Sequence, residues 1–481
     1  MGDSILLRDR TEMWGVSPEV REIEGKTKRR GFTFPSVDLT EGSIVRNLII
    51  FIIPLFLGQL LQQLYNVADA WVVGNFARNA AFAAVSSAGN LCFLIIGLFN
   101  GIAIGGGVII SKYYGAKDHE QVEIAVHTNM LVGVWSSVIA TVLGLIFIPQ
   151  ILRLMNTPEN VMPEAVAYFR VYFGGVCTII FYNICMSIMR SLGDSIHPLY
   201  YLAISSVLNV VMDLLFVAVF HWGVIGASLA TVIAQGVSVI LCLIQMVKAT
   251  DESHISFSKM KWNGSMMKEV LVQGLPTGIQ NSVISVGNLA IQTSINSFGS
   301  YAMAGVGAYT KIEGFAFLPI TGVSMAMPTF ISQNLGARKV SRAKKGAAIG
   351  VLGGVAIAEL IGLGFFLFTA PLIRFFVDVP ESVAFGVTQA HTTTLFYCLL
   401  AFSHCAAGVL RGCGKSVVPM MTMLICWCGV RVVYVNTALR IHHVFGMIAW
   451  AYPLTWCLST IVFLVCMLRM DWEHALTGLR N

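Results

Sequence analysis

Four polar side chains lie on one face of the first long apolar segment, Leu48 to Gly74. Their spacing of three, four and seven residues places them in one row on a helix: Gln62, Tyr65, Asn66 and Asp69. A carboxylate inside a membrane-length helix costs about 2.5–3.5 kcal/mol even on the mildest insertion scale, so Asp69 marks a functional site by default. Pro54 removes a backbone hydrogen bond from the same helix and predicts a kink.

Three further polar residues are expected at the depth of Asp69. Asp69 lies about five residues before the end of the first segment, Asp213 about seven before the end of the fifth, and Thr231 about six into the sixth. Asn209 is one turn from Asp213 on the same helix face. We therefore expect two carboxylates, an amide and a hydroxyl to converge in one pocket.

Two acids in one desolvated pocket take up a proton readily, because burial and a neighbouring carboxylate both disfavour the charged form. The same oxygens are suited to bind sodium. We therefore predict a cation-coupling site at Asp69 and Asp213, for a proton or for sodium. The alternative is a pair of structural acids that other groups satisfy.

The elements that must position these residues are membrane-spanning helices. The 481 residues are 56% hydrophobic and 12% charged, against about 25% charged in soluble domains. Segments of about 20 apolar residues recur along the chain, and we count twelve between residues 47 and 468. A β-barrel would show alternating segments of about ten residues instead. An all-α membrane protein is predicted.

The positions of Lys and Arg predict the orientation. With both termini cytoplasmic, 24 of the 31 basic residues face inward and only four face outward: Arg78, Arg153, Arg374 and Arg440. A multi-pass protein of the inner (plasma) membrane is expected. The net charge of +6 belongs to these loops, so no nucleic-acid partner is expected. The first apolar run begins only near Leu48, and we expect no cleavable signal peptide.

The chain contains one unit twice. Ile110–Lys117 matches Ile331–Arg338, and Arg190–Pro198 matches Arg411–Pro419, both at an offset of 221. Six spans per unit make the two lobes parallel repeats. The predicted organisation is a cytoplasmic tail at 1–45, an N-lobe at 46–248, a cytoplasmic linker at 249–268, a C-lobe at 269–470 and a cytoplasmic tail at 471–481.

The substrate path is expected between the lobes, lined by Gln62, Asn66, Tyr168, Tyr172 and Asn288. Arg170 is level with the two acids but points away from Tyr168 and Tyr172 on its helix. Either the tyrosines line the cavity or the arginine does. Arg170 either pairs with an acid or extends to the outer interface.

A second charged set lies near the middle of the C-lobe: Lys311, Glu313, Glu359 and Arg431. Two positive and two negative charges cancel, which favours a buried structural network, with substrate binding or lobe coupling as the alternative. The repeat offset aligns Asp69 with Ile291 and Asp213 with Tyr434. The cation site is therefore predicted in the N-lobe alone.

These features resemble the multidrug and toxic compound extrusion (MATE) transporters, and most closely their bacterial damage-inducible branch. The resemblance covers roughly residues 38–468. It is carried by Asp38-Leu39-Thr40-Glu41-Gly42, Pro54, Gln62 to Asp69, Gly115-Ala116, Gly336-Ala337, Asn209 and Asp213. It implies a V-shaped pair of lobes that exports amphipathic, often cationic compounds in exchange for protons or sodium.

By motif match, Asp69 is similar to the family's first-helix carboxylate and Tyr65 to the tyrosine one turn before it. Asn209 and Asp213 are similar to its fifth-helix pair, and Thr231 to its sixth-helix hydroxyl. Sodium-coupled members of another branch carry acids in helices 7 and 10. This chain has none in its seventh span, and its tenth has only His391 and His404.

The leading hypothesis is a monomeric secondary-active antiporter in contact with membrane lipid, without a cofactor or a resident metal beyond possible sodium at Asp69 and Asp213. A flippase for lipid-linked saccharides is the alternative, but it would need a basic cavity. An enzyme is not expected, because no catalytic constellation or metal-binding histidine set is present. A channel is disfavoured, since no filter-like loop appears.

Overall fold

The computed structural model is helical, and its described residues contain no β-strand. Those residues are 37–76, 79–154, 159, 161–249, 253–256 and 259–476, with side chains described outside 79–94 and 154. The predicted tails at 1–45 and 471–481 and the linker at 249–268 therefore lie partly outside them.

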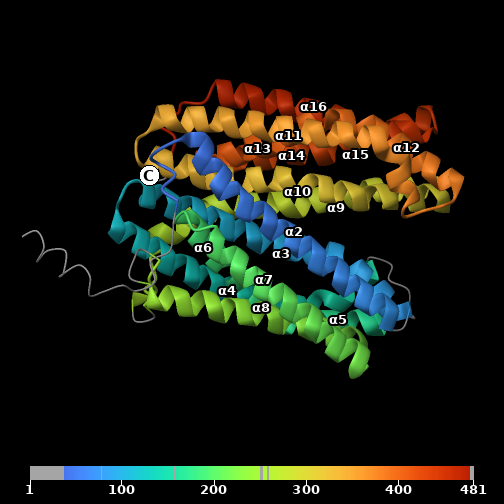
Figure 1. Cartoon of the computed structure of the whole chain (residues 1–481), viewed down its shortest axis with the longest axis horizontal. Helices are drawn as coiled ribbons and strands as arrows, with labels where there is room; N and C mark the ends of the chain where they lie inside the picture. The colour runs from blue at the N-terminus through green and yellow to red at the C-terminus, as the bar shows by residue number, and fades with distance from the viewer. Residues whose placement is uncertain are drawn as a thin grey trace, which may run out of the picture.

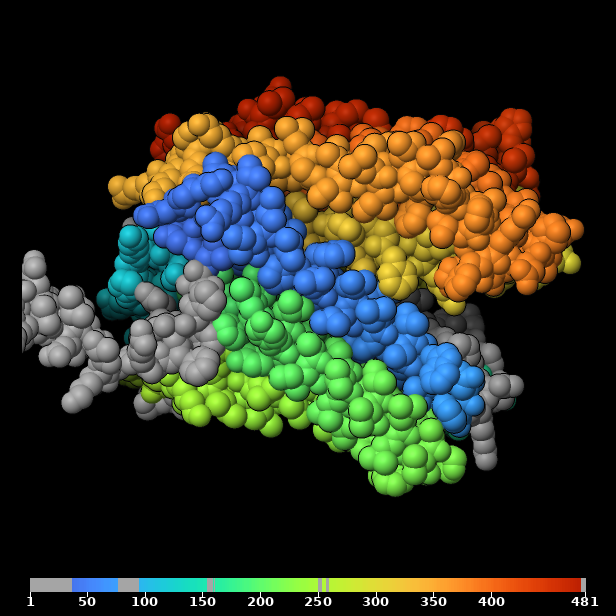
Figure 2. Space-filling model, viewed as in Figure 1, coloured from blue at the N-terminus to red at the C-terminus, as the bar shows by residue number. Residues whose placement is uncertain are grey.

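Two groups of long helices form the molecule (Figure 1). The N-lobe contains α2 (Ile44–Phe76), α3 (Asn79–Gly115), α4 (His119–Leu154), α5 (Met162–Gly174), α6 (Val176–Ser191), α7 (Ile196–Asp213), the π-helical η1 (Leu214–Val219) and α8 (Gly223–Lys248). The C-lobe contains α9 (Gly264–Asn296), α10 (Ser300–Gly336), α11 (Val340–Arg374), α12 (Pro380–Thr393), η3 (Thr394–Phe396), α13 (Tyr397–Gly412), α14 (Val417–Met423), the π-helical η4 (Leu424–Val430), α15 (Arg431–Ile441) and α16 (Phe445–Leu468). The two groups diverge away from the C terminus, as the space-filling view also shows (Figure 2).

The span count agrees with the sequence prediction. Within the described residues, ten helical segments are long and apolar enough to cross a membrane, and the bent pair α5–α6 is an eleventh. The predicted span at 270–298 is α9, a 33-residue helix that is less apolar than the others. The all-α membrane fold is confirmed.

The fourth predicted span, 163–188, is not continuous. The chain bends by 49° between α5 and α6, where Gly174 and Gly175 follow each other. A Cβ added at Gly175 would lie 2.2 Å from Cγ1 of Val232 on α8. Glycine permits both the break and this close approach.

Helix α2 packs on both lobes. Its Leu48, Phe51 and Leu55 belong to an apolar core shared with α10, α11 and α13 of the C-lobe. Its Val72 and Val73 belong to the N-lobe core. Figure 1 shows α2 crossing from α11 towards α5 and α7. The sequence prediction placed all of α2 in the N-lobe, whereas its first half packs on the C-lobe. The helix is continuous through Pro54.

The lobes approach each other closely where α3 crosses α9. A Cβ added at Gly101 would lie 2.1 Å from the backbone nitrogen of Gly278, and one at Gly105 would lie 2.3 Å from Cα of Gly274. Backbone atoms cannot move aside as a flexible side chain can. Only glycine fits here, as in other close crossings of membrane helices.

The equivalent crossing of the other repeat is wider. The repeat offset aligns Gly101 with Gly322 on α10 and Gly278 with Phe56 on α2. A Cβ added at Gly322 would lie 3.3 Å from Cβ of Phe56. The Phe56 side chain keeps α2 and α10 apart. The duplicated fold therefore has one tight crossing, α3–α9, and one looser crossing, α2–α10.

Gly278→Ala is expected to destabilise the protein, because the new Cβ would lie 2.3 Å from the Leu98 carbonyl oxygen and force α3 away from α9. We expect a loss of about 1–3 kcal/mol, the usual cost of overpacking. The melting temperature of the purified protein in detergent measures it. Gly353→Ala on α11, where an added Cβ meets nothing within 4 Å, is the control. Equal melting temperatures for the two variants would contradict the tight crossing.

Candidate functional site

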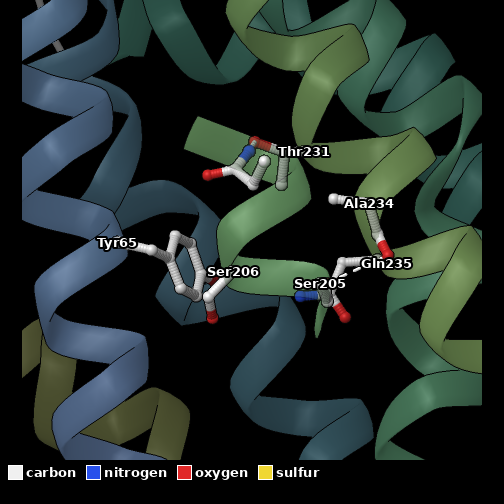
Figure 3. A pocket seen from close by; sticks show the side chains of 7 residues that line it. Tyr65, Ser205, Ser206, Thr231, Ala234 and Gln235 are labelled. Carbon is white, nitrogen blue, oxygen red and sulfur yellow. Dashed lines mark hydrogen bonds between the residues drawn. The ribbon is translucent and has the colours of Figure 1, made fainter. Parts of the chain in front are cut away.

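Three helices of the N-lobe bring the predicted cation-coupling residues together. α2 supplies Tyr65 and Asp69, α7 supplies Asn209 and Asp213, and α8 supplies Thr231. Figure 3 shows the Tyr65 ring directed from α2 towards α7 and α8. The Tyr65 hydroxyl interacts with the side chains of Gln62 and Gln235 and lies near both carboxylates. The convergence inferred from depth is therefore present in three dimensions.

The two carboxyl groups are direct neighbours. Asp69 and Asp213 interact through their side chains, and Asp213 is completely buried, at 0% exposure. No donor group among the described residues reaches either oxygen of Asp213 or Oδ1 of Asp69. The helix widens into the π-helical η1 immediately after Asp213, and π-bulges frequently occur at functional sites.

A small pocket lies beside the acids, with an empty volume of about 150 Å³. Its lining residues are Tyr65, Ser205, Ser206, Asn209, Thr231, Ala234 and Gln235 (Figure 3). Ligand pockets for drug-sized molecules measure about 300–1,000 Å³. It is a narrow gap between packed side chains without room for a water molecule in this conformation, and it is too small for a drug.

The pocket also holds acceptors without donors. The Asn209 Nδ2 group donates to the Thr231 hydroxyl at 3.5 Å. The Oδ1 atom of Asn209 has no hydrogen-bond donor. The Oε1 atom of Gln235 is likewise without a donor. Together with the carboxylates, five buried acceptor oxygens gather here. Buried polar atoms in proteins are nearly always satisfied, so this set fits a proton or a small cation shared among them.

Sequence reasoning missed Gln235, Ser205 and Ser206. Gln235 follows Thr231 by one helical turn, which places both on one face of α8. That spacing could have identified it. The two serines donate their hydroxyls to backbone carbonyls, Ser205 to Ala234 and Ser206 to Leu202. Nothing in their sequence spacing indicated that they line this pocket.

A family model described as MatE matches the chain twice, over residues 54–215 and 276–436. This chain belongs to the MatE family. Its members are membrane transporters and need no cofactor, and ion coupling is a family property. The two matches begin 222 residues apart, which agrees with the internal duplication.

The probable multidrug resistance protein YpnP of Bacillus subtilis is 28% identical over 391 residues, covering 81% of this chain and 87% of the relative. The probable multidrug resistance protein NorM of Thermotoga maritima is 25% identical over 394 residues, covering 79% and 83%. A solved structure described as the outward-facing conformation of a multidrug resistance MATE family transporter superposes with a TM-score of 0.84. It covers 94% of this chain and 100% of that chain at 22% identity, which shows a shared fold.

The structure distinguishes between the two predicted roles of Arg170, pairing with an acid and extending to the outer interface. Tyr168 and Tyr172 are buried in the N-lobe core with stacked rings, 5.9 Å between centroids. Arg170 is exposed and forms no ion pair with Asp69 or Asp213. Pairing with an acid is therefore excluded in this conformation. Tyr168 and Tyr172 belong to the buried N-lobe core, and their role in lining a substrate cavity stays a prediction.

The other predicted cavity residues are separated. Gln62 lies beside Tyr65 at the cation site. Asn66 on α2 and Asn288 on α9 are both exposed, and no pocket described for the protein contains either one. The four polar residues predicted to share one face of the first helix therefore have different surroundings. Gln62, Tyr65 and Asp69 lie at the site, whereas Asn66 does not line its pocket.

The predicted charged network of the C-lobe is not a single network. No ion pair joins any two of Lys311, Glu313, Glu359 and Arg431, all of which are described. Glu313 accepts a hydrogen bond from the Tyr309 hydroxyl at 2.8 Å. Glu359 accepts one from the Cys398 N–H at 3.0 Å. Lys311 is exposed, with its Nζ 5.8 Å from the Phe376 ring centroid.

Arg431 is the most buried of the four charges and is held without a carboxylate in contact. Its guanidinium donates two hydrogen bonds to the Thr455 hydroxyl, at 2.9 and 3.1 Å. It also lies 4.6 Å from the ring centroid of Tyr452 and 5.4 Å from that of Trp427. Cation–π contacts strengthen when they are desolvated. Glu313 and Arg431 still influence each other electrostatically without direct contact, so compensation of charge between these two residues stays a prediction.

Asp213→Asn is expected to leave the protein at least as stable as the native chain at pH 8. The substitution keeps the shape of a buried side chain and removes an acid group that no donor among the described residues satisfies and that lies beside a second acid. Thermal melting in detergent measures this. Asp378→Asn, at an exposed position, is the matched control. A large loss of stability for Asp213→Asn alone would mean that Asp213 is a structural anchor.

Proposed function

We propose that this MatE-family protein is a secondary-active antiporter that exports amphipathic, mostly cationic compounds in exchange for a cation bound at Asp69 and Asp213. The observation that carries the proposal is the set of five buried acceptor oxygens without donors, contributed by Asp69, Asp213, Asn209 and Gln235. Multidrug resistance proteins among the relatives support the class of exported compound.

The proposed cycle begins with uptake of the cation from the outer side. A proton or a sodium ion at the pair would remove the repulsion between the carboxylates, so α2 and α7 would be drawn together. Tyr65 would adjust with them, because it interacts with Gln62 on α2 and Gln235 on α8. Pro54 is the position in α2 where bending costs least, since its backbone hydrogen bond is already missing.

The proposal also covers the membrane, the oligomeric state and the orientation of the protein. We place it in the plasma membrane as a monomer in contact with lipid. Both termini are placed in the cytoplasm, because 24 of 31 basic residues then face inward. The assignment to the damage-inducible branch stays a prediction. The flippase alternative is not favoured, because the buried polar site presents acceptor oxygens, which repel a pyrophosphate.

Asp69→Asn is expected to reduce gradient-driven export of a cationic dye to the rate of protein-free vesicles. The amide can neither take up a proton nor supply a negative charge for sodium. Efflux is measured in reconstituted vesicles with a proton gradient and a sodium gradient imposed separately, and the gradient that drives the native chain identifies the ion.

Asp378→Asn, an exposed acid, should export the dye like the native chain. Undiminished export by Asp69→Asn would rule out coupling at this site. Absence of dye export by the native chain under both gradients would contradict the antiporter proposal and favour the flippase.

A further inference from the structure

The residues Val37–Ser43, here called the strap, precede α2 and carry the sequence motif Asp38-Leu39-Thr40-Glu41-Gly42. The motif has no part in the cation site. In Figure 1 the chain enters α2 at the end of the molecule where the C terminus also lies. The contacts of the strap assign it a different role.

One arginine of the C-lobe holds three carbonyls of the strap. Arg342 on α11 donates from Nε to Leu39 at 3.1 Å, from Nη1 to Gly42 at 2.6 Å and from Nη2 to Glu41 at 2.7 Å. Hydrogen bonds from a charged donor are roughly twice as strong as neutral ones. The planar guanidinium also fixes the shape of the turn that it holds.

The C-lobe makes further contacts with the same turn. Lys339 donates to the Thr40 carbonyl at 3.0 Å, and Asn334 on α10 donates to the Leu39 carbonyl at 3.2 Å. All four consecutive carbonyls from Leu39 to Gly42 are therefore bound by C-lobe side chains. The Leu39 side chain is fully buried in the core shared by α10, α11 and the first half of α2.

The strap also touches the N-lobe. The Val37 N–H donates to the Gly193 carbonyl in the turn between α6 and α7 at 3.2 Å. Gly193 has a φ of +88°, and a Cβ there would lie 2.6 Å from the Val37 carbonyl oxygen. This close approach requires glycine. The strap thus bonds both lobes at the same end of the molecule.

The two helices that flank this junction are in close contact as well. Gly115 of α3 packs against the Gln333 carbonyl, and Gly336 of α10 packs against the Lys112 carbonyl. Neither glycine has room for a Cβ atom. The Ser332 hydroxyl donates to the Val108 carbonyl at 2.6 Å. Parting the lobes at this end must break these contacts and also one of the two attachments of the strap.

We propose that the strap is a latch that keeps this end of the two lobes closed, and that Arg342 is the positioning residue that holds it. Arg342 acts through the strap and the start of α2, without touching the cargo or the cation. The C-lobe supplies five hydrogen bonds to the strap and the N-lobe one. On opening, the strap stays with the C-lobe and the Val37–Gly193 contact breaks. The inference rests on the proposed function, because it assumes that the lobes part at this end during transport.

The test is hydrogen–deuterium exchange of the full chain in detergent, read by mass spectrometry in peptides over the strap and over the adjoining ends of α3 and α10. Arg342→Gln should raise the opening equilibrium about tenfold in all three regions, which corresponds to about 1.4 kcal/mol. Lys344→Gln, on an exposed basic residue of the same helix, is the matched control and should change nothing.

Faster exchange in the strap alone would show local fraying and would overturn the latch, as would no change in any region. Leu39→Ala removes the buried anchor by a different route and should act in the same direction. Arg342→Lys keeps the positive charge but loses the planar guanidinium with its several N–H donors. The effect of this variant should therefore lie between those of the native chain and Arg342→Gln. These two variants decide the question if Arg342→Gln does not fold.

Dye export is measured on the same preparations. A native chain that exports no dye would contradict the antiporter proposal while the exchange data still report on the strap. A native chain that exports dye while Arg342→Gln and Leu39→Ala leave α3 and α10 unchanged would overturn the latch alone.

Discussion

The central constraint in the structure is a pair of neighbouring carboxyl groups, three of whose four oxygens meet no donor among the described residues. Asp213 is fully buried in α7, and Asp69 reaches it from α2. Coulomb repulsion between two charged carboxylates is strong in a desolvated site, so such a pair favours uptake of a proton or another cation. The surrounding groups, Tyr65, Asn209 and Gln235, add polarity without adding positive charge. Under the proposed function, the position of α2 against the N-lobe is linked to the occupancy of this site.

The same helix is held at its other end by the opposite lobe. Phe51 and Leu55 pack into the C-lobe, and Arg342 binds the turn that precedes the helix. One continuous helix thus connects Asp69 with the end of the molecule where the lobes meet. The repeats differ at this point: α3 and α9 cross with glycine against glycine, whereas Phe56 separates α2 from α10. The helix that carries the acid is the one held more loosely.

The sequence was informative where a physical rule acts along one dimension. Membrane-length segments and the 221-residue repeat depend on counting residues, and both are confirmed. Counting also predicted that Asp69, Asp213 and Thr231 lie at one level, and the helices that carry them do pack together. The sequence was less informative about the direction in which each side chain faces around its helix axis. Tyr168 and Tyr172 face the core, Lys311 and Glu359 face different surroundings, and Gln235 was missed. The bend at Gly175 and the strap depend on tertiary contacts that no periodicity reveals.

Helix α9 has a consequence for how the protein enters the membrane. Two of its glutamines find partners in and after the turn between α13 and α14: Gln273 donates to the Gly414 carbonyl and accepts from Ser416, and Gln280 contacts Met423. These partners are made about 140 residues later in synthesis. Before then, α9 carries amides that lipid cannot satisfy. These hydrogen bonds can form only after the α13–α14 turn and α14 have been made, so α9 reaches its final packing later than its place in the chain suggests.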